Sequence, residues 1–97
     1  MDAFRQEQSG VLQKVLGVLV PYERDEHFNI LKVSIACAGE REVVVENLPQ
    51  HIQLLEFLRE PILLEGLVTR NGNIETINVK RVIPFVKSEF FNSRKMK

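Results

Sequence analysis

Five short runs rich in valine, isoleucine and leucine divide this chain, and proline, glycine or charged residues separate them. The runs occupy residues 11–20, 29–38, 41–46, 62–69 and 74–83. β-Branched residues and the alternation of apolar with polar side chains favour strands over helices. We therefore predict five strands and a mostly β domain.

The links between the runs indicate which predicted strands pair. Residues 38–40 are too short a link for anything but a hairpin between the second and third strands. The sequence Arg70-Asn-Gly-Asn73 is the strongest hairpin signal in the chain and joins the last two strands. Residues 21–27 begin with proline and are predicted to be a charged connection. Gly17 indicates a bulge or bend in the first strand.

A different pattern separates the third and fourth strands. Pro49 fits the first turn of a helix, and apolar residues follow it at three- and four-residue spacing. Pro61 forces the preceding residue out of the helical region. We therefore predict a helix of about three turns over residues 49–59.

Alternation assigns side chains of the predicted strands to two faces. The residues expected to point inward are Leu31, Val33, Ile35, Cys37, Val43 and Val45. Those expected to point outward are Ile30, Lys32, Ser34, Ala36, Glu42, Val44 and Glu46.

Four features carry a resemblance to a known fold: the run 11–20 with Gly17, the hairpin 29–46, the helix 49–59, and the phrase from Leu58 to Val68 running into Asn71-Gly72. Their order resembles the oligonucleotide- and oligosaccharide-binding (OB) fold, with its anticodon-binding and single-strand-binding members. The resemblance implies an all-β fold with one helix, a five-stranded Greek-key barrel in β-β-β-α-β-β order. An SH3-like small barrel is the competing architecture. Residues 1–10 would form a polar N-terminal segment, 11–83 the barrel, and 84–97 a basic tail containing phenylalanines.

Composition sets limits on location and partners. Thirteen basic and thirteen acidic residues give a formal net charge of zero, but residues 1–69 sum to −5 and residues 70–97 to +5. This asymmetry indicates an anionic partner at the C-terminal end, or a basic end that complements the acidic body. One cysteine, no signal-like N-terminus and no long apolar run favour a cytoplasmic protein without a membrane segment.

The residues needed for catalysis or metal binding do not form a known pattern. His27 and His51 lie 24 residues apart, outside any two-histidine helix motif, and both are expected to be solvated. The cluster Glu23, Asp25 and Glu26 lacks the spacing of a calcium loop. Cys37 lies on the apolar phase and is expected to be a small core residue. We therefore predict no enzymatic activity, no catalytic residues, no metal and no cofactor.

The OB resemblance implies a ligand across the second and third strands and the flanking loops. A weak, salt-sensitive site for single-stranded DNA or RNA would use cations and stacking groups. On the barrel these are Tyr22, Arg24, Phe28, Lys32, Arg70, Asn71, Asn73 and Lys80. On the tail they are Lys87, Arg94, Lys95 and Lys97. The two loop groups are expected to converge at one mouth of the barrel, although turn chemistry and solvation explain the same loop residues.

The alternative is a barrel that binds a protein partner or a second copy of itself. Glu42, Val44 and Glu46 would then form an acidic docking face. Phe90 and Phe91 in the tail would pack on a partner subunit or on the barrel itself, because exposed phenylalanines lower solubility.

Overall fold

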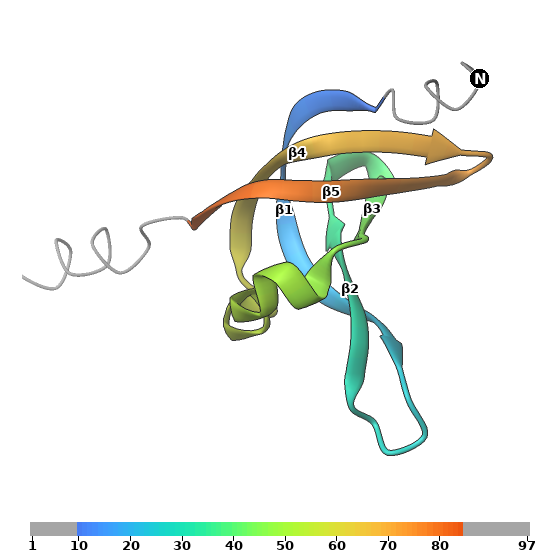
Figure 1. Cartoon of the computed structure of the whole chain (residues 1–97), viewed down its shortest axis with the longest axis vertical. Helices are drawn as coiled ribbons and strands as arrows, with labels where there is room; N and C mark the ends of the chain where they lie inside the picture. The colour runs from blue at the N-terminus through green and yellow to red at the C-terminus, as the bar shows by residue number, and fades with distance from the viewer. Residues whose placement is uncertain (1–9, 85–97) are drawn as a thin grey trace, which may run out of the picture.

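The computed structural model describes residues 10–84 as five strands whose hydrogen bonds join them in a closed ring (Figure 1). The strands are β1 (Val11–Arg24), β2 (Ile30–Ala36), β3 (Glu42–Val45), β4 (Pro61–Asn71) and β5 (Ile74–Pro84). Two 3-10 segments, η1 (Ala38–Glu40) and η2 (Leu48–Phe57), lie between them. The ring order is β1-β2-β3-β5-β4, with β3 and β5 parallel and the other neighbours antiparallel. The predictions of five strands and of one helical segment between the third and fourth strands are confirmed.

Strand β1 closes the ring because it pairs with two different neighbours. Its first half, through Val18, pairs with β4, and its second half, from Val18 onward, pairs with β2. Gly17 lies at this change of partner, and a Cβ there would overlap the carbonyl oxygen of Ala36. The pairing of β1 with β4 is regular through Gly17, so the predicted bulge is absent there, and the glycine instead allows the close approach of Ala36.

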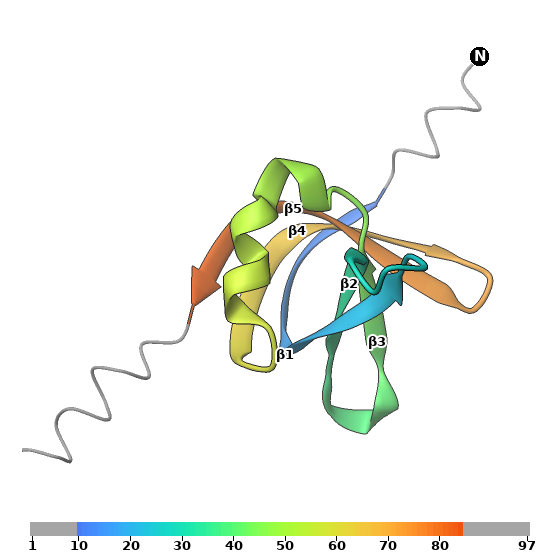
Figure 2. The same ribbon diagram turned by 90° about the horizontal axis from the view of Figure 1, so that it is seen from below.

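The β1–β2 hairpin is longer than the sequence indicates. The prediction that residues 21–27 form a connection is wrong, because β1 continues through Pro21 to Arg24. The register shifts between Pro21 and Glu23, and such irregularities are among the places where a strand accommodates proline. As a result the hairpin projects away from the rest of the ring in Figure 1, and the view from below in Figure 2 looks onto its end.

The segment η2 differs in type from the predicted helix. It is a 3-10 segment over Leu48–Phe57, interrupted at His51, where φ is −137° and ψ is 50°. Leu48 and Leu54, six residues apart, are both buried in the core. The interruption at His51 lies between them, so the two leucines belong to two short helical turns and not to one continuous helix.

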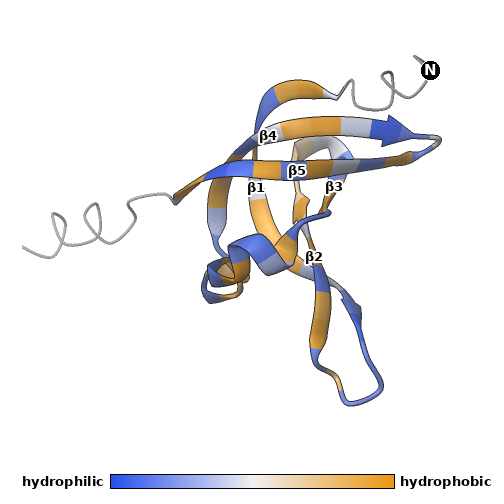
Figure 3. Cartoon of the chain, in the orientation of Figure 1, coloured by the Kyte–Doolittle hydropathy of each residue, from blue (hydrophilic) through white to orange (hydrophobic). Residues whose placement is uncertain are grey.

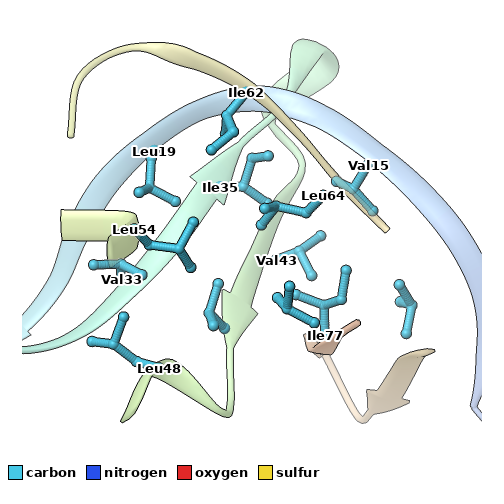
Figure 4. Close-up of a cluster of buried hydrophobic side chains, with 13 residues drawn as sticks. Val15, Leu19, Val33, Ile35, Val43, Leu48, Leu54, Ile62, Leu64 and Ile77 are labelled. Carbon is cyan, nitrogen blue, oxygen red and sulfur yellow. The ribbon is translucent and has the colours of Figure 1, made fainter. Parts of the chain in front are cut away.

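The core lies inside the ring and draws on every strand and on η2 (Figure 4). Its members are Val15, Leu19, Val33, Ile35, Val43, Val45, Leu48, Leu54, Ile62, Leu64, Val68, Ile77 and Val79. The predicted inward positions Val33, Ile35, Val43 and Val45 are all confirmed. Cys37 follows β2 and packs partly against this core.

Four predictions of facing are wrong. Leu31 is exposed, because it lies on the projecting hairpin beyond the core, and Ile30 instead packs partly against the core beside a register shift. Ser34 and Val44 were expected to face solvent but are buried, and they pair with each other in register. The Ser34 hydroxyl donates to Glu42 at 2.7 Å, which satisfies it without water.

Candidate functional site

The turn of the β1–β2 hairpin is held by Asp25. Its Oδ1 accepts hydrogen bonds from the backbone N–H groups of His27 at 2.8 Å and Asn29 at 2.9 Å. Its Oδ2 accepts a third, at 3.1 Å, from the side-chain amide of Asn29. The bonds from Asn29 and His27 favour the charged carboxylate and lower the pKa of Asp25. The acidic cluster predicted from the sequence thus contains a residue that shapes the turn.

Phe28 occupies an unusual position in this turn. Its backbone N–H donates to the carbonyl of Asp25 at 2.9 Å, and its φ is 67°. A three-residue hairpin loop of this kind usually has glycine at its left-handed position. Any other residue costs roughly 1–2 kcal/mol there. The ring of Phe28 is 76% exposed, so core packing does not offset that cost.

The other predicted binding residues of the hairpin surround this turn. Tyr22 is exposed on β1. The Arg24 guanidinium donates to the carbonyl oxygen of Phe28 at 3.2 Å, and Lys32 lies 3.6 Å from Glu23 in an exposed ion pair. Both cations expected to contact phosphate therefore have partners within the hairpin. Residues 22–32 carry two basic and three acidic side chains, a net charge of −1 with His27 neutral.

The second predicted loop lies elsewhere. Arg70 Nε donates to the carbonyl of Gly72 at 3.3 Å within the β4–β5 turn, and Asn71 and Asn73 are exposed beside it. Figure 1 shows that the β4–β5 turn and the projecting β1–β2 hairpin point to different sides of the molecule. The structure does not bring the two loop groups together at one mouth. Lys80 is exposed on β5.

The predicted acidic face is interrupted. Glu42 accepts from Ser34, and Glu46 Oε2 accepts from the Asn78 side-chain amide at 3.0 Å. Both glutamates are exposed, but Val44 between them is only 8% exposed. Val44 therefore offers a partner little apolar surface. The predicted tail residues Lys87, Phe90, Phe91, Arg94, Lys95 and Lys97 lie outside the described residues.

A polar cluster that the sequence analysis missed lies at the margin of the core. Arg41 donates to both carboxylate oxygens of Glu75, at 2.8 and 3.1 Å, and to the Gln13 side-chain oxygen at 3.4 Å. The bond to Arg41 lowers the pKa of Glu75, and the same bond raises that of Arg41. Each of these three residues lies two positions before a core residue of the same run. Because side chains alternate along a strand, this spacing places them on the core side, and it is the sequence signal that would have revealed the cluster.

The remaining chemistry-bearing side chains serve the fold. His51 was expected to be solvated, but it is partly buried and its Nε2 lies 3.0 Å from the Val79 carbonyl oxygen, so this contact corrects the prediction. Burial raises the pKa of the Cys37 thiol. Within residues 10–84 no three histidine, cysteine or acidic side chains gather where they would hold a metal ion.

Exposed apolar side chains are the feature that the sequence analysis did not weigh. They gather on β1 and on the β1–β2 hairpin, as the hydropathy colouring of Figure 3 illustrates for β1. On these elements they are Val11, Leu12, Leu16, Val18, Tyr22, Phe28 and Leu31, whereas Ile52 of η2 and Ile74 of β5 are exposed elsewhere. Surface-exposed leucine and phenylalanine in such number favour an interaction with another macromolecule.

Together these features define a small β protein with a closed five-stranded sheet, a projecting hairpin and a partly apolar exterior. Comparisons with protein-family models, curated proteins and solved structures find no match for this chain. In the part of the chain that the structure describes, no helix is long and apolar enough to cross a membrane.

Proposed function

We propose that this chain is a non-enzymatic binding module on a Greek-key barrel of the OB type, and that it binds a protein partner through the tip of the β1–β2 hairpin. Two features support the architecture. The ring contains neighbours that are not consecutive in sequence, β3 with β5 and β1 with β4. A helical segment also lies between the third and fourth strands, as the OB resemblance implies.

Phe28 is the observation that carries the proposed activity. A left-handed backbone and an exposed ring both disfavour phenylalanine there as far as folding is concerned. Aromatic side chains that enter a pocket of a partner are frequent anchors of protein interfaces. We infer that the ring of Phe28 is retained for such a pocket.

The surroundings of Phe28 define the chemistry of the partner. Exposed Tyr22 and Leu31 extend the apolar surface along the hairpin. Residues 22–32 carry a net charge of −1, so a complementary partner presents an apolar pocket with a small excess of basic residues around it.

Two measurements on Phe28 test this function. Replacing Phe28 with glycine should stabilise the protein against urea by about 1 kcal/mol, because glycine adopts the left-handed conformation without strain. A photo-crosslinking phenylalanine analogue at position 28 should give a discrete protein adduct in cell extract, whereas the same analogue at exposed Ile52 of η2 should not. The purified adduct partner should then bind the parent chain and lose at least about tenfold in affinity for Phe28→Gly.

Either of two results would contradict this proposal. One is a destabilised Phe28→Gly variant, which would show that the ring serves the fold. The other is a crosslinked protein that binds the glycine variant as tightly as the parent chain.

Single-stranded nucleic acid is the second candidate ligand. The observation that favours it is the presence of Tyr22 and Phe28 on the same hairpin as Arg24 and Lys32, since rings and cations together bind single strands. Crosslinking at position 28 to RNA or DNA instead of protein would support this candidate.

A further inference from the structure

Strands β1 and β4 carry a second apolar surface on the outside of the ring. Val15, Leu19, Ile62 and Leu64 of these strands are buried in the core. Side chains alternate along a strand, so the residues between them point outward. The face of β1 and β4 opposite the core, here the β1–β4 face, consists of Leu12, Lys14, Leu16, Val18, Pro61, Leu63, Glu65 and Leu67.

This face is apolar and accessible. Leu12 is 59% and Leu16 53% exposed, and Leu63 and Leu67 are partly exposed beside them. Figure 3 shows hydrophobic residues along much of β1, and their burial assigns Val15 and Leu19 to the core and Leu12 and Leu16 to the outside. Leucine side chains so exposed contribute little to the core and leave apolar area in water.

The pairing register gives this face a particular symmetry. Leu12 pairs with Leu67, Lys14 with Glu65, and Leu16 with Leu63. Apolar residues therefore lie opposite apolar residues, and a cation lies opposite an anion. Within one copy, Glu65 forms an ion pair with Arg81 of β5, at 3.1 Å.

We propose that the β1–β4 face binds the same face of a second copy of this chain. A two-fold axis between β1 and β4 and parallel to them places each residue over its own cross-strand partner in the second copy. Leu16 then meets Leu63 of the other copy, and Lys14 meets its Glu65. The face is thus complementary to itself, as an interface between identical subunits related by a two-fold axis must be.

Two geometric facts limit the size and strength of this contact. Packed sheets are rotated by about 30° relative to each other, so the correspondence is closest at the centre, around Lys14 and Leu16. From Leu12 to Val18 is six residue steps, about 20 Å of strand. A contact between two short strands of each copy is small for a specific interface, so we expect a reversible dimer.

Sedimentation equilibrium of the full chain over a range of concentrations tests the proposal. The parent chain should show a monomer–dimer equilibrium. Leu16→Glu should raise the dissociation constant at least about tenfold, a change of about 1.4 kcal/mol. Ile52→Glu, which changes an equally apolar exposed residue on η2, should leave it unchanged. Circular dichroism of each variant separates loss of dimer from loss of fold.

A charge exchange tests the register itself. Lys14→Glu and Glu65→Lys should each weaken the homodimer, because each places like charges opposite one another. Mixing the two variants should restore a dimer, since both contacts then join opposite charges. A register with Lys14 over Lys14 and Glu65 over Glu65 predicts the rescue but not the weakening of each variant alone, so the two results together identify the proposed register.

Three results would overturn the proposal. A parent chain that stays monomeric at all concentrations would exclude it, as would a dimer that Leu16→Glu leaves intact. A monomer that Leu16→Glu destabilises, while Ile52→Glu does not, would show that Leu16 is covered within its own chain and not by a second copy.

Discussion

Arg41 and Glu75 show how single residues stabilise the margin of the core. Glu75 is two positions before the core residue Ile77, and its side chain is 16% exposed, against 38% for Arg41. A carboxylate in that position needs a partner, and the two parallel hydrogen bonds from Arg41 supply one. The exposure of Arg41 keeps the contribution of the pair modest, at about 1 kcal/mol.

The pH dependence of this pair follows from the lowered pKa of Glu75. Because the folded-state pKa of Glu75 is lowered, its carboxylate stabilises the folded protein at pH values above the ordinary pKa of 4.5. This contribution is lost as the pH falls through the lowered pKa. Arg41→Gln should therefore cost about 1 kcal/mol in urea unfolding at pH 7 and much less near pH 3.

The exposed Arg81–Glu65 pair supplies a matched control. Arg81→Gln should cost less than about 0.5 kcal/mol at pH 7, because the Arg81 side chain is largely in solvent. An Arg41→Gln penalty of the same size at both pH values would show that Arg41 acts through packing and not through its charge.

At the scale of elements, Asn47 fixes η2 to the sheet. Its side-chain oxygen accepts from the backbone N–H of Val79 at 2.8 Å, and its amide donates to the Val79 carbonyl oxygen at 3.0 Å. The backbone N–H of Glu46 donates to Ile77 just before it. The Asn47 side chain thus continues the contact between β3 and β5 beyond the end of β3.

Asn47→Ala should destabilise the protein by about 1–3 kcal/mol, because it leaves the buried N–H of Val79 without this partner, while the Val79 carbonyl oxygen keeps its contact with His51. Urea unfolding measures the loss, and hydrogen exchange should show the Val79 amide exchanging faster. Asn47→Asp keeps the acceptor for the Val79 N–H but loses the donor, so its Val79 amide should stay protected. Equal exchange rates for Val79 in the parent and Asn47→Ala would contradict this role.

The same scale shows what sequence can predict here. Runs of β-branched residues and the Asn71-Gly72 turn locate the strands, because pleat period and turn chemistry are local properties. The type of η2 and the burial of Ser34 and Val44 depend on which residues lie across the ring, and no local pattern contains that information. Pro21 predicts the end of the first strand, but β1 accommodates this proline beside a register shift.

The candidate site was predictable in identity but not in arrangement. Tyr22, Arg24, Phe28 and Lys32 were named from the sequence, yet their partners arise from hairpin geometry. The left-handed backbone of Phe28 belongs to a turn in which His27 and Asn29 donate to the Asp25 carboxylate, an arrangement that the residue types alone do not specify. The β1–β4 face was missed because both phases of β1 are apolar, so alternation cannot mark an outer surface there.

For the whole molecule, the distribution of charge indicates which residues would contact the phosphates of a nucleic acid. Residues 10–84 carry eight basic and ten acidic side chains, a net charge of −2. Residues 85–97 carry four basic and one acidic, a net charge of +3. Contacts to phosphate should therefore depend on the C-terminal cations more than on the ring.

Fluorescence anisotropy of a labelled single-stranded RNA, at about 50 and 200 mM salt, tests that expectation. Four phosphate contacts predict micromolar binding that weakens about fiftyfold over this range. Replacing Lys87, Arg94, Lys95 and Lys97 with glutamine should remove this salt dependence, whereas Arg24→Gln with Arg70→Gln should largely preserve it. If instead Arg24→Gln with Arg70→Gln removes the salt dependence, the phosphate contacts lie on the loops of the ring. Absence of binding at about 50 mM salt would exclude nucleic acid as the ligand and leave the protein partner of Phe28.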